Sequence, residues 1–299
     1  MDRLWTQAGV FLLALLCGCI SGPTQEDNTG KLQVVATIYP LYEMSKAVGA
    51  DKAKVTLLIP PGSEIHTFEP TPQSAMKLEQ ADLFITNGLG LEHWAERLVS
   101  ASGNMKLTTL DASSGITPLN LSGGGYDPHV FQDPLLATAQ LDNVLSAYIR
   151  KDPANSEYYS ANARRYREQL LNVSGDYENG LANCSIRIIL VNHPFLGYPA
   201  VRYGFKQIAL SGSSPEAELL PLDLQKAATT ARANAVKYVV YESTVSPKNA
   251  QTLADEANLT VVAASTAHEI TVEDYNAGRT YINLLEQDLQ VIRKVMDCE

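Results

Sequence analysis

The sequence predicts an α/β protein of two lobes, each with a mostly parallel four-stranded sheet, joined by one long rigid helix. Apolar strand-like segments alternate with helical ones in both halves of the chain, and a purely helical stretch separates the halves. The halves also echo each other. "VVATIYPLYEMSKAVGA" and "IILVNHPFLGYPAVRYGF" both pass from an apolar strand through a proline into a helix.

Strands and helices alternate in the first half. The apolar segment 31–40 is typical of a buried strand, and 41–50 of the helix that follows it. A second strand is predicted over 54–62. The segment 71–81 has proline near its start and apolar residues at helical spacing, which indicates a helix. A third strand is predicted over 82–88.

The middle of the chain, from about Leu135 to Leu181, is helical in composition almost throughout. The pair Asp152-Pro153 divides it into two helices, because proline disfavours helix continuation at the residue before it. The second helix has about 25 residues and would reach nearly 40 Å at about 1.5 Å per residue. We interpret it as the rod that connects the lobes.

Strands return in the second half. They are predicted over 186–194, 206–212, 235–242 and 259–265, and a helix follows over about 274–296. In open parallel sheets, ligands bind at the carboxyl ends of the strands. The loops that follow these strands are therefore the places to search for functional side chains.

The N-terminus resembles an export signal. A short polar start with Arg3 precedes an apolar run from about Ala8 to Cys17, which is shorter than the roughly 20 residues of a membrane span. Leu16, two small residues and Cys19 resemble a prokaryotic lipobox, in which the cysteine is lipidated. The predicted organisation is a lipoprotein signal peptide over 1–19, a linker over 20–30, an N-terminal lobe over 31–152, the connecting helix over 153–182 and a C-terminal lobe over 183–299.

Composition narrows the function classes. A chain of 299 residues that is 45% hydrophobic and 19% charged is globular, not disordered. Its formal net charge is −10 and its basic residues are not clustered, so no nucleic-acid partner is expected. Two further cysteines, Cys184 and Cys298, would lie in an oxidising compartment, where a disulfide is permitted. The sequence leaves their pairing open.

Histidine placement gives the strongest functional signal. Four of the five histidines lie in loops after apolar stretches, and these are His66, His129, His193 and His268. The fifth, His93, is expected inside a helix beside Trp94 and in no ligand role. Neutral imidazole is a common ligand of Zn²⁺ and similar metals. The sequence lacks the H-E-x-x-H spacing of a metalloprotease, so local spacing alone does not identify a site.

The chain resembles the zinc/manganese substrate-binding lipoproteins of ABC importers, the family known as cluster A-I. The resemblance covers about residues 31–296 and rests on "IPPGSEIHTFEPTPQSAMKLEQADLFITNGLGLEHW", "DPHVFQDP" and "VNHPFLGYPAVRYGF". It implies His66, His129 and His193 as metal ligands in a cleft between the lobes. A histidine in the third place resembles the zinc-type members, so Zn²⁺ is expected ahead of Mn²⁺.

The fourth metal ligand follows least directly from the family resemblance. The family usually has Asp or Glu after the last strand, whereas this chain reads "AASTAHEITVEDY". Counting back from the final helix favours His268 for that place, with Glu269 and Glu242 as alternatives. The long His-rich loop of many zinc members is absent from the sequence.

The resemblance implies a non-enzymatic protein that captures Zn²⁺ outside the cell membrane and passes it to an ABC permease and its ATPase. It implies a monomer held on the extracytoplasmic face by a lipid on Cys19. Two other functions stay open. One is a lipid-anchored metallohydrolase, with three histidines holding zinc and an open position for water. The other is an adhesin that uses the same fold.

Overall fold

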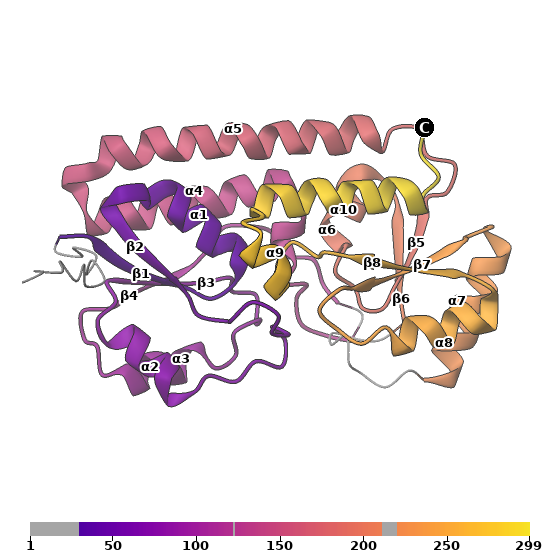
Figure 1. Cartoon of the computed structure of the whole chain (residues 1–299), viewed down its shortest axis with the longest axis horizontal. Helices are drawn as coiled ribbons and strands as arrows, with labels where there is room; N and C mark the ends of the chain where they lie inside the picture. Colours follow the sequence, from indigo (N-terminus) through magenta and orange to yellow (C-terminus); the bar gives the residue numbers. More distant parts are fainter. Residues whose placement is uncertain (1–29, 122, 211–219) are drawn as a thin grey trace, which may run out of the picture.

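The computed structural model describes residues 30–121, 123–210 and 220–299. The predicted signal peptide, Cys19 and nearly all of the linker lie outside these residues. Two lobes stand side by side, each with a sheet between an upper and a lower layer of helices (Figure 1). Within the described ranges, no helix combines the length and apolarity that crossing a bilayer would require.

Each lobe holds a parallel four-stranded sheet, and the strand order is the same in both: β2-β1-β3-β4 and β6-β5-β7-β8. The strands are β1 (Leu32–Ala36), β2 (Ala53–Leu57), β3 (Leu83–Thr86), β4 (Thr108–Asp111), β5 (Ile188–Val191), β6 (Lys206–Ala209), β7 (Tyr238–Glu242) and β8 (Thr260–Ala264). Val34 of β1 pairs with Val55 and Leu83. In the second sheet, Leu190 pairs with Ile208 and Val239. The predicted fold class and the echo between the halves are confirmed.

Helices cover both faces of the sheets. Their bounds are α1 (Tyr39–Gly49), α2 (Pro72–Glu79), α3 (Ala95–Ser102), α4 (Pro134–Lys151), α5 (Ser156–Gly180), α6 (Gly197–Tyr203), α7 (Pro221–Ala233), α8 (Lys248–Ala257), α9 (Val272–Asn276) and α10 (Tyr281–Val295). In Figure 1, α2 and α3 lie below the first sheet and α7 and α8 below the second, while α1, α4 and α10 lie above, under α5.

The connecting helix α5 runs along both lobes (Figure 1). Its buried apolar side chains recur every three or four residues and form one stripe: Tyr159, Ala163, Tyr166, Leu170, Val173 and Tyr177. The helix contacts α1 and α4 in the first lobe and α10 in the second. The Tyr177 hydroxyl donates to the carbonyl oxygen of Leu285 at 2.8 Å. The expected rod is therefore packed against both lobes along its length. The exact domain boundaries stay a prediction.

One apolar core extends through both lobes. A single cluster of buried side chains includes Val34 in the first sheet, Leu170 in α5, Val191 in the second sheet and Leu285 in α10. A smaller second cluster fills the space between the second sheet and α7 and α8, around Leu190 and other residues. Because the larger core is shared, moving one lobe against the other would disturb close-packed side chains.

The structure adds one strand and corrects two local expectations. The fourth strand of the first sheet, β4, was not placed from the sequence, because its threonines leave it half exposed and without a strong apolar pattern. The expected single helix over 274–296 is two helices. Gly278, with a φ of +71°, and the cap formed by Thr280 and Asn283 end the first and start the second. His93 lies in a turn before α3, not inside the helix.

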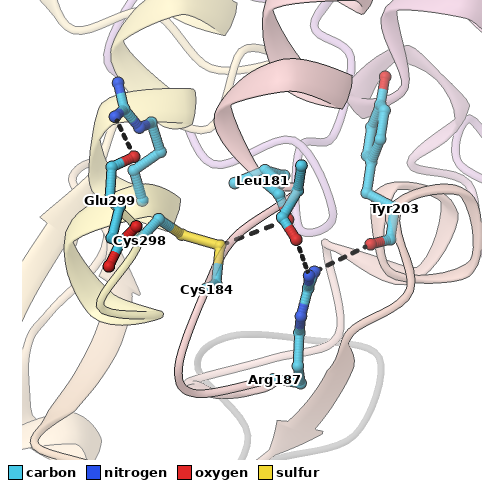
Figure 2. The surroundings of a disulfide bond; sticks show 8 residues. Leu181, Cys184, Arg187, Tyr203, Cys298 and Glu299 are labelled. Atoms are coloured by element: carbon cyan, nitrogen blue, oxygen red, sulfur yellow. Dashed lines mark hydrogen bonds between the residues drawn. A yellow bond between two sulfur atoms is a disulfide. The ribbon is translucent and has the colours of Figure 1, made fainter.

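The two cysteines whose pairing the sequence leaves open form a disulfide in the structure. Cys184, after α5, is bonded to Cys298, after α10, across a sequence separation of 114 (Figure 2). Nearby, the Arg187 guanidinium donates to the carbonyl oxygens of Ala182 and Tyr203. The disulfide fastens the end of α10 to the segment that leads into β5. The C-terminus, one residue after Cys298, is marked near the end of α5 in Figure 1.

Candidate metal centre

Three predicted ligands converge on one point between the lobes. The Nε2 atoms of His66 and His129 lie 3.2 Å apart, and those of His129 and His193 lie 3.3 Å apart. Ligand atoms of all three side chains fall within 4.8 Å of one another. Tetrahedral zinc with Zn–N bonds of about 2.0–2.1 Å places its nitrogen ligands about 3.3 Å apart. The two observed nitrogen separations match the edge length of a tetrahedral zinc site.

The fold delivers these imidazoles from strand ends. His193 follows β5 directly, and the N–H of Asn192 continues the sheet pairing by donating to the carbonyl of Val240 at 2.9 Å. His66 stands on the loop after β2, where the Glu64 carboxylate accepts its backbone N–H at 2.8 Å. In the same loop, the side chain of Ile65 is buried in the protein interior and anchors the loop. Both lobes therefore contribute ligands at the carboxyl edges of their sheets, as the sheet rule predicts.

His129 lies in the connection from β4 to α4. Its backbone N–H and its Nδ1 both contact Asp127 Oδ1, at 3.0 and 2.7 Å. Both side chains are buried. Since a carboxylate accepts and cannot donate, the contact places the imidazole proton on Nδ1 and leaves the lone pair on Nε2. That lone pair faces the convergence point.

His193 is oriented in the same way. Its Nδ1 contacts Oε2 of Glu242, the last residue of β7, and both side chains are fully buried. Asn192 Nδ2 donates to the same carboxylate oxygen at 3.3 Å. The Nε2 lone pair of His193 therefore also faces the convergence point. Two buried lone pairs at 3.3 Å repel each other unless a cation lies between them, so this arrangement suits a metal ion.

The fourth predicted ligand lies beside the three but is turned to other partners. His268 Nε2 is 3.2 Å from Glu242 Oε1, and its Nδ1 is 3.4 Å from the Gln132 amide nitrogen. Its ring centre lies 5.4 Å from that of His129 and 6.3 Å from that of His66. His268, Glu242 and Glu269 form a second buried group whose ligand atoms lie within 4.8 Å of one another.

Glu269 faces the loop that carries His66. Its Oε1 accepts the N–H of Ile65 at 3.0 Å and lies 3.8 Å from His268 Nε2. A second bond between the same segments runs from the Gly62 N–H to the Ile270 carbonyl at 2.8 Å. The second lobe thus holds the His66 loop of the first at two points.

Burial favours the neutral form of two site imidazoles, those of His66 and His268. It lowers the pKa of His66 well below 6.5, and the neighbouring histidines lower it further. Burial likewise lowers the pKa of His268 to about 4, although Glu242 opposes the shift. Burial would raise the pKa of Glu242, but His193 and His268 outweigh it and hold that pKa well below 4.5. At neutral pH, His66 and His268 therefore offer neutral nitrogen donors near the charged Glu242 carboxylate, which suits a divalent cation.

One side of the centre is open to solvent. His66 is half-buried, whereas His129, His193 and His268 are 0–2% exposed. A cavity of about 210 Å³ opens beside His66 and His129 and is also lined by His93 and Tyr126. His93 itself pairs with Glu69 at 3.2 Å on the surface. A metal ion can reach the cluster from this side, and His93 stands apart from the converging nitrogens.

Sequence reasoning missed two partners of the site. Asp127 was visible as the first residue of "DPH", but only the turn at Pro128 brings its carboxylate onto His129. Gln132 follows His129 by three residues and meets His268 from the other lobe. For Glu242, the sequence had suggested a carboxylate near the metal, and the structure puts it between two imidazoles.

Comparisons with known proteins give consistent matches. Residues 34–295 match a family described as zinc-uptake complex component A, periplasmic. The high-affinity zinc uptake system protein ZnuA of Bacillus subtilis is 32% identical over 305 residues, covering 97% of this chain and 96% of that protein.

Solved structures agree with the sequence matches. Zn(II)-bound AdcA of Streptococcus pneumoniae has a TM-score of 0.79 and 31% identity, covering 90% of this chain and 58% of that one. The chain therefore spans a little over half of AdcA. The laminin-binding protein Lmb of Streptococcus agalactiae, described as bifunctional with adhesin and metal transporting activity, has a TM-score of 0.81 and 28% identity, covering 89% and 99%.

Proposed function

We propose a zinc-capture function from one premise: this chain belongs to the family of periplasmic zinc-uptake component A proteins. It is an extracytoplasmic zinc-binding component of a zinc uptake system; its Bacillus subtilis relative is named a high-affinity zinc uptake system protein. Zinc is the cargo, held between the lobes and released to the transporter. The expected preference for Zn²⁺ over Mn²⁺ agrees with a centre whose converging donors are imidazole nitrogens.

The observation that carries this proposal is the geometry of three nitrogens. The Nε2 atom of His129 lies 3.2 Å from that of His66 and 3.3 Å from that of His193. Asp127 and Glu242 hold the other ring nitrogens of His129 and His193. We assign these three histidines as ligands. The two carboxylates orient the rings and offset part of the charge of the bound ion.

We assign the fourth position to His268. Support comes from its complete burial, its neutral state at pH 7 and its place beside His129. To bind zinc it has to exchange its contact with Glu242 or Gln132 for the metal. Glu269 and Glu242 are the competing candidates. His268→Ala is expected to weaken zinc binding by about tenfold or more, since loss of even an outer partner of a metal ligand typically costs that much. Glu269→Ala is expected to weaken zinc binding by less.

The remaining assignments concern the transport system. We propose that the chain is a monomer, delivers zinc to an ABC permease and its ATPase, and is attached to the membrane by a lipid on Cys19. It performs no catalysis in this proposal. A metallohydrolase would need an open zinc position for water and a general base beside it. Zinc that is retained without hydrolytic turnover separates the two functions.

The direct test is metal analysis of the purified protein followed by substitution. About one zinc ion per chain is expected, and His66→Ala or His193→Ala is expected to reduce the affinity severely. His93→Ala is the matched control, because it removes an imidazole that lies outside the cluster. A His66→Ala protein that held zinc as tightly as the parent would disprove the ligand assignment.

A further inference from the structure

Asp288 is a buried carboxylate in α10 that does not touch the converging histidines. It is 2% exposed and lies 20 residues beyond His268 in the sequence. Its hydrogen bonds go to one short segment. Oδ1 accepts the Ser265 N–H at 3.0 Å and the Ser265 hydroxyl at 2.7 Å, and Oδ2 accepts the Ala267 N–H at 3.2 Å.

The segment that Asp288 holds leads directly into the metal centre. Residues 265–267 connect the end of β8 to His268 and Glu269. Successive backbone N–H groups that point at one anion form a concave anion nest. Here the anion is a side chain of the protein itself, fixed on a long helix. The path of the backbone before His268 is therefore set by α10.

The backbone of this segment is strained at Thr266. It has a φ of +38°, in the left-handed region that β-branched residues rarely adopt. Its side chain is fully buried, and its hydroxyl has no hydrogen-bond partner within the described residues. Such conformations persist only where the surroundings over-determine them, and they concentrate at functional sites. The bonds from Asp288 to both neighbours of Thr266 supply that constraint.

A turn then aims the two site residues. The Glu269 N–H donates to the Thr266 carbonyl at 2.9 Å, so Thr266 opens the turn that presents His268 and Glu269. From this turn His268 reaches Glu242 and Gln132, and Glu269 reaches Ile65 beside His66. A change of backbone path at 265–267 would move both side chains together.

We infer that Asp288 is a positioning residue of the zinc site: it fixes the strained turn at Thr266, and through it the place of His268 and Glu269. This inference rests on the proposed function, because it assumes that one of these two side chains completes the zinc shell. It assigns no contact between Asp288 and the metal. Asp288 affects zinc affinity only through the positions of residues 265–269.

The test measures zinc affinity in the full chain for Asp288→Ala and Asp288→Asn, beside the parent protein. Leu289→Ala is the matched control. Leu289 is the next residue of α10 and is buried against α5 near Gly180, so its truncation weakens the packing of the same helix without touching the loop. Affinity is measured by competition with a zinc chelator at a temperature where circular dichroism shows every variant folded.

The inference predicts that Asp288→Ala raises the zinc Kd by about tenfold or more, as expected of an outer partner of a metal site. Leu289→Ala should stay within about twofold of the parent. Asp288→Asn keeps a hydrogen-bond acceptor for Ser265, so its zinc Kd should lie between those of Leu289→Ala and Asp288→Ala. Equal losses in Asp288→Ala and Leu289→Ala would overturn the inference, because the effect would then be one of general stability. A parent-like Kd for Asp288→Ala would overturn it too.

A double-mutant cycle checks the route of the effect. If Asp288 acts through His268, the zinc loss in Asp288→Ala/His268→Ala should be clearly smaller than the product of the two single losses. The same cycle with Glu269→Ala tests the other side chain, and fully multiplicative losses in both cycles would overturn the inference. Cobalt absorption provides a further readout: Asp288→Ala should change the visible spectrum of bound Co²⁺, whereas Leu289→Ala should not. If the parent protein binds no zinc, the proposed function fails, which is a separate result.

Discussion

Removal of the Asp127 carboxylate should weaken zinc binding although Asp127 is not a ligand. In the structure, this carboxylate accepts the Nδ1 proton of His129 at 2.7 Å, with both side chains buried. In Asp127→Ala the ring is free to rotate and to place its proton on Nε2, which blocks the metal-facing lone pair. Outer partners of metal-binding histidines typically contribute about 10- to 100-fold in affinity, or about 1.4–2.7 kcal/mol.

The upper part of that range is expected, because the contact is short, charge-assisted and shielded from water. Asp127→Asn retains a carbonyl oxygen for Nδ1 and should lose less. Asp142→Ala is the matched control: it removes the same charge from a side chain in α4 that is 53% exposed, and it should change the affinity by less than about twofold.

The assay is competition with a chromophoric zinc chelator at constant pH and ionic strength, together with the zinc dissociation rate. Circular dichroism confirms that each variant is folded. A folded Asp127→Ala protein with an affinity within twofold of the parent would show that the tautomer argument for His129 is wrong.

Four further predictions concern zinc binding, stability and overall shape. Gly197→Ala should weaken zinc binding in an affinity titration, because a Cβ at this position would lie 2.2 Å from Asp127 Oδ2. In the metal-free protein, His268 should contribute a loss of about 3 kcal/mol of unfolding free energy as the pH falls from about 6.5 to about 4, because it stays neutral when folded and protonates when unfolded. Denaturant titrations of the parent and of His268→Ala at several pH values measure this contribution. Replacing Cys184 and Cys298 with serine should lower the unfolding free energy by about 2–5 kcal/mol, given the 114-residue separation, and leave zinc affinity unchanged. X-ray scattering with and without zinc should give nearly equal radii of gyration, since α5 packs on both lobes; a large change would contradict the rigid-rod interpretation.

Much of the fold was predictable because its signals are local. Alternating apolar segments and helical stretches identify a two-lobed parallel α/β protein, and the family resemblance adds which loop histidines to bring together. The edge strand β4 carries a weaker signal, because Thr108 and Thr109 leave it partly exposed. The break before α10 depends on the backbone conformation of Gly278, which composition does not reveal.

Apart from the local contact of Asp127 with His129, the contacts that sequence reasoning missed depend on distant segments meeting. Gln132 and His268 come from different lobes, 136 residues apart. Asp288 reaches back 23 residues to Ser265 through the packing of α10. The contact of Cys184 with Cys298 likewise exists only after α5 and α10 are packed together. Such pairings depend on three-dimensional packing, so residue spacing alone left them undetermined.

The apolar core that continues through both lobes makes them one cooperative folding unit. Side chains of the first sheet, α5, the second sheet and α10 belong to a single cluster, so complete opening of either lobe exposes part of the other. A bound ion that touches both lobes then stabilises all of this unit equally, by about 4 kcal/mol when free zinc is 1,000 times its Kd. Hydrogen exchange of the most protected amides in α5, away from the metal, should slow by the corresponding factor of about 1,000.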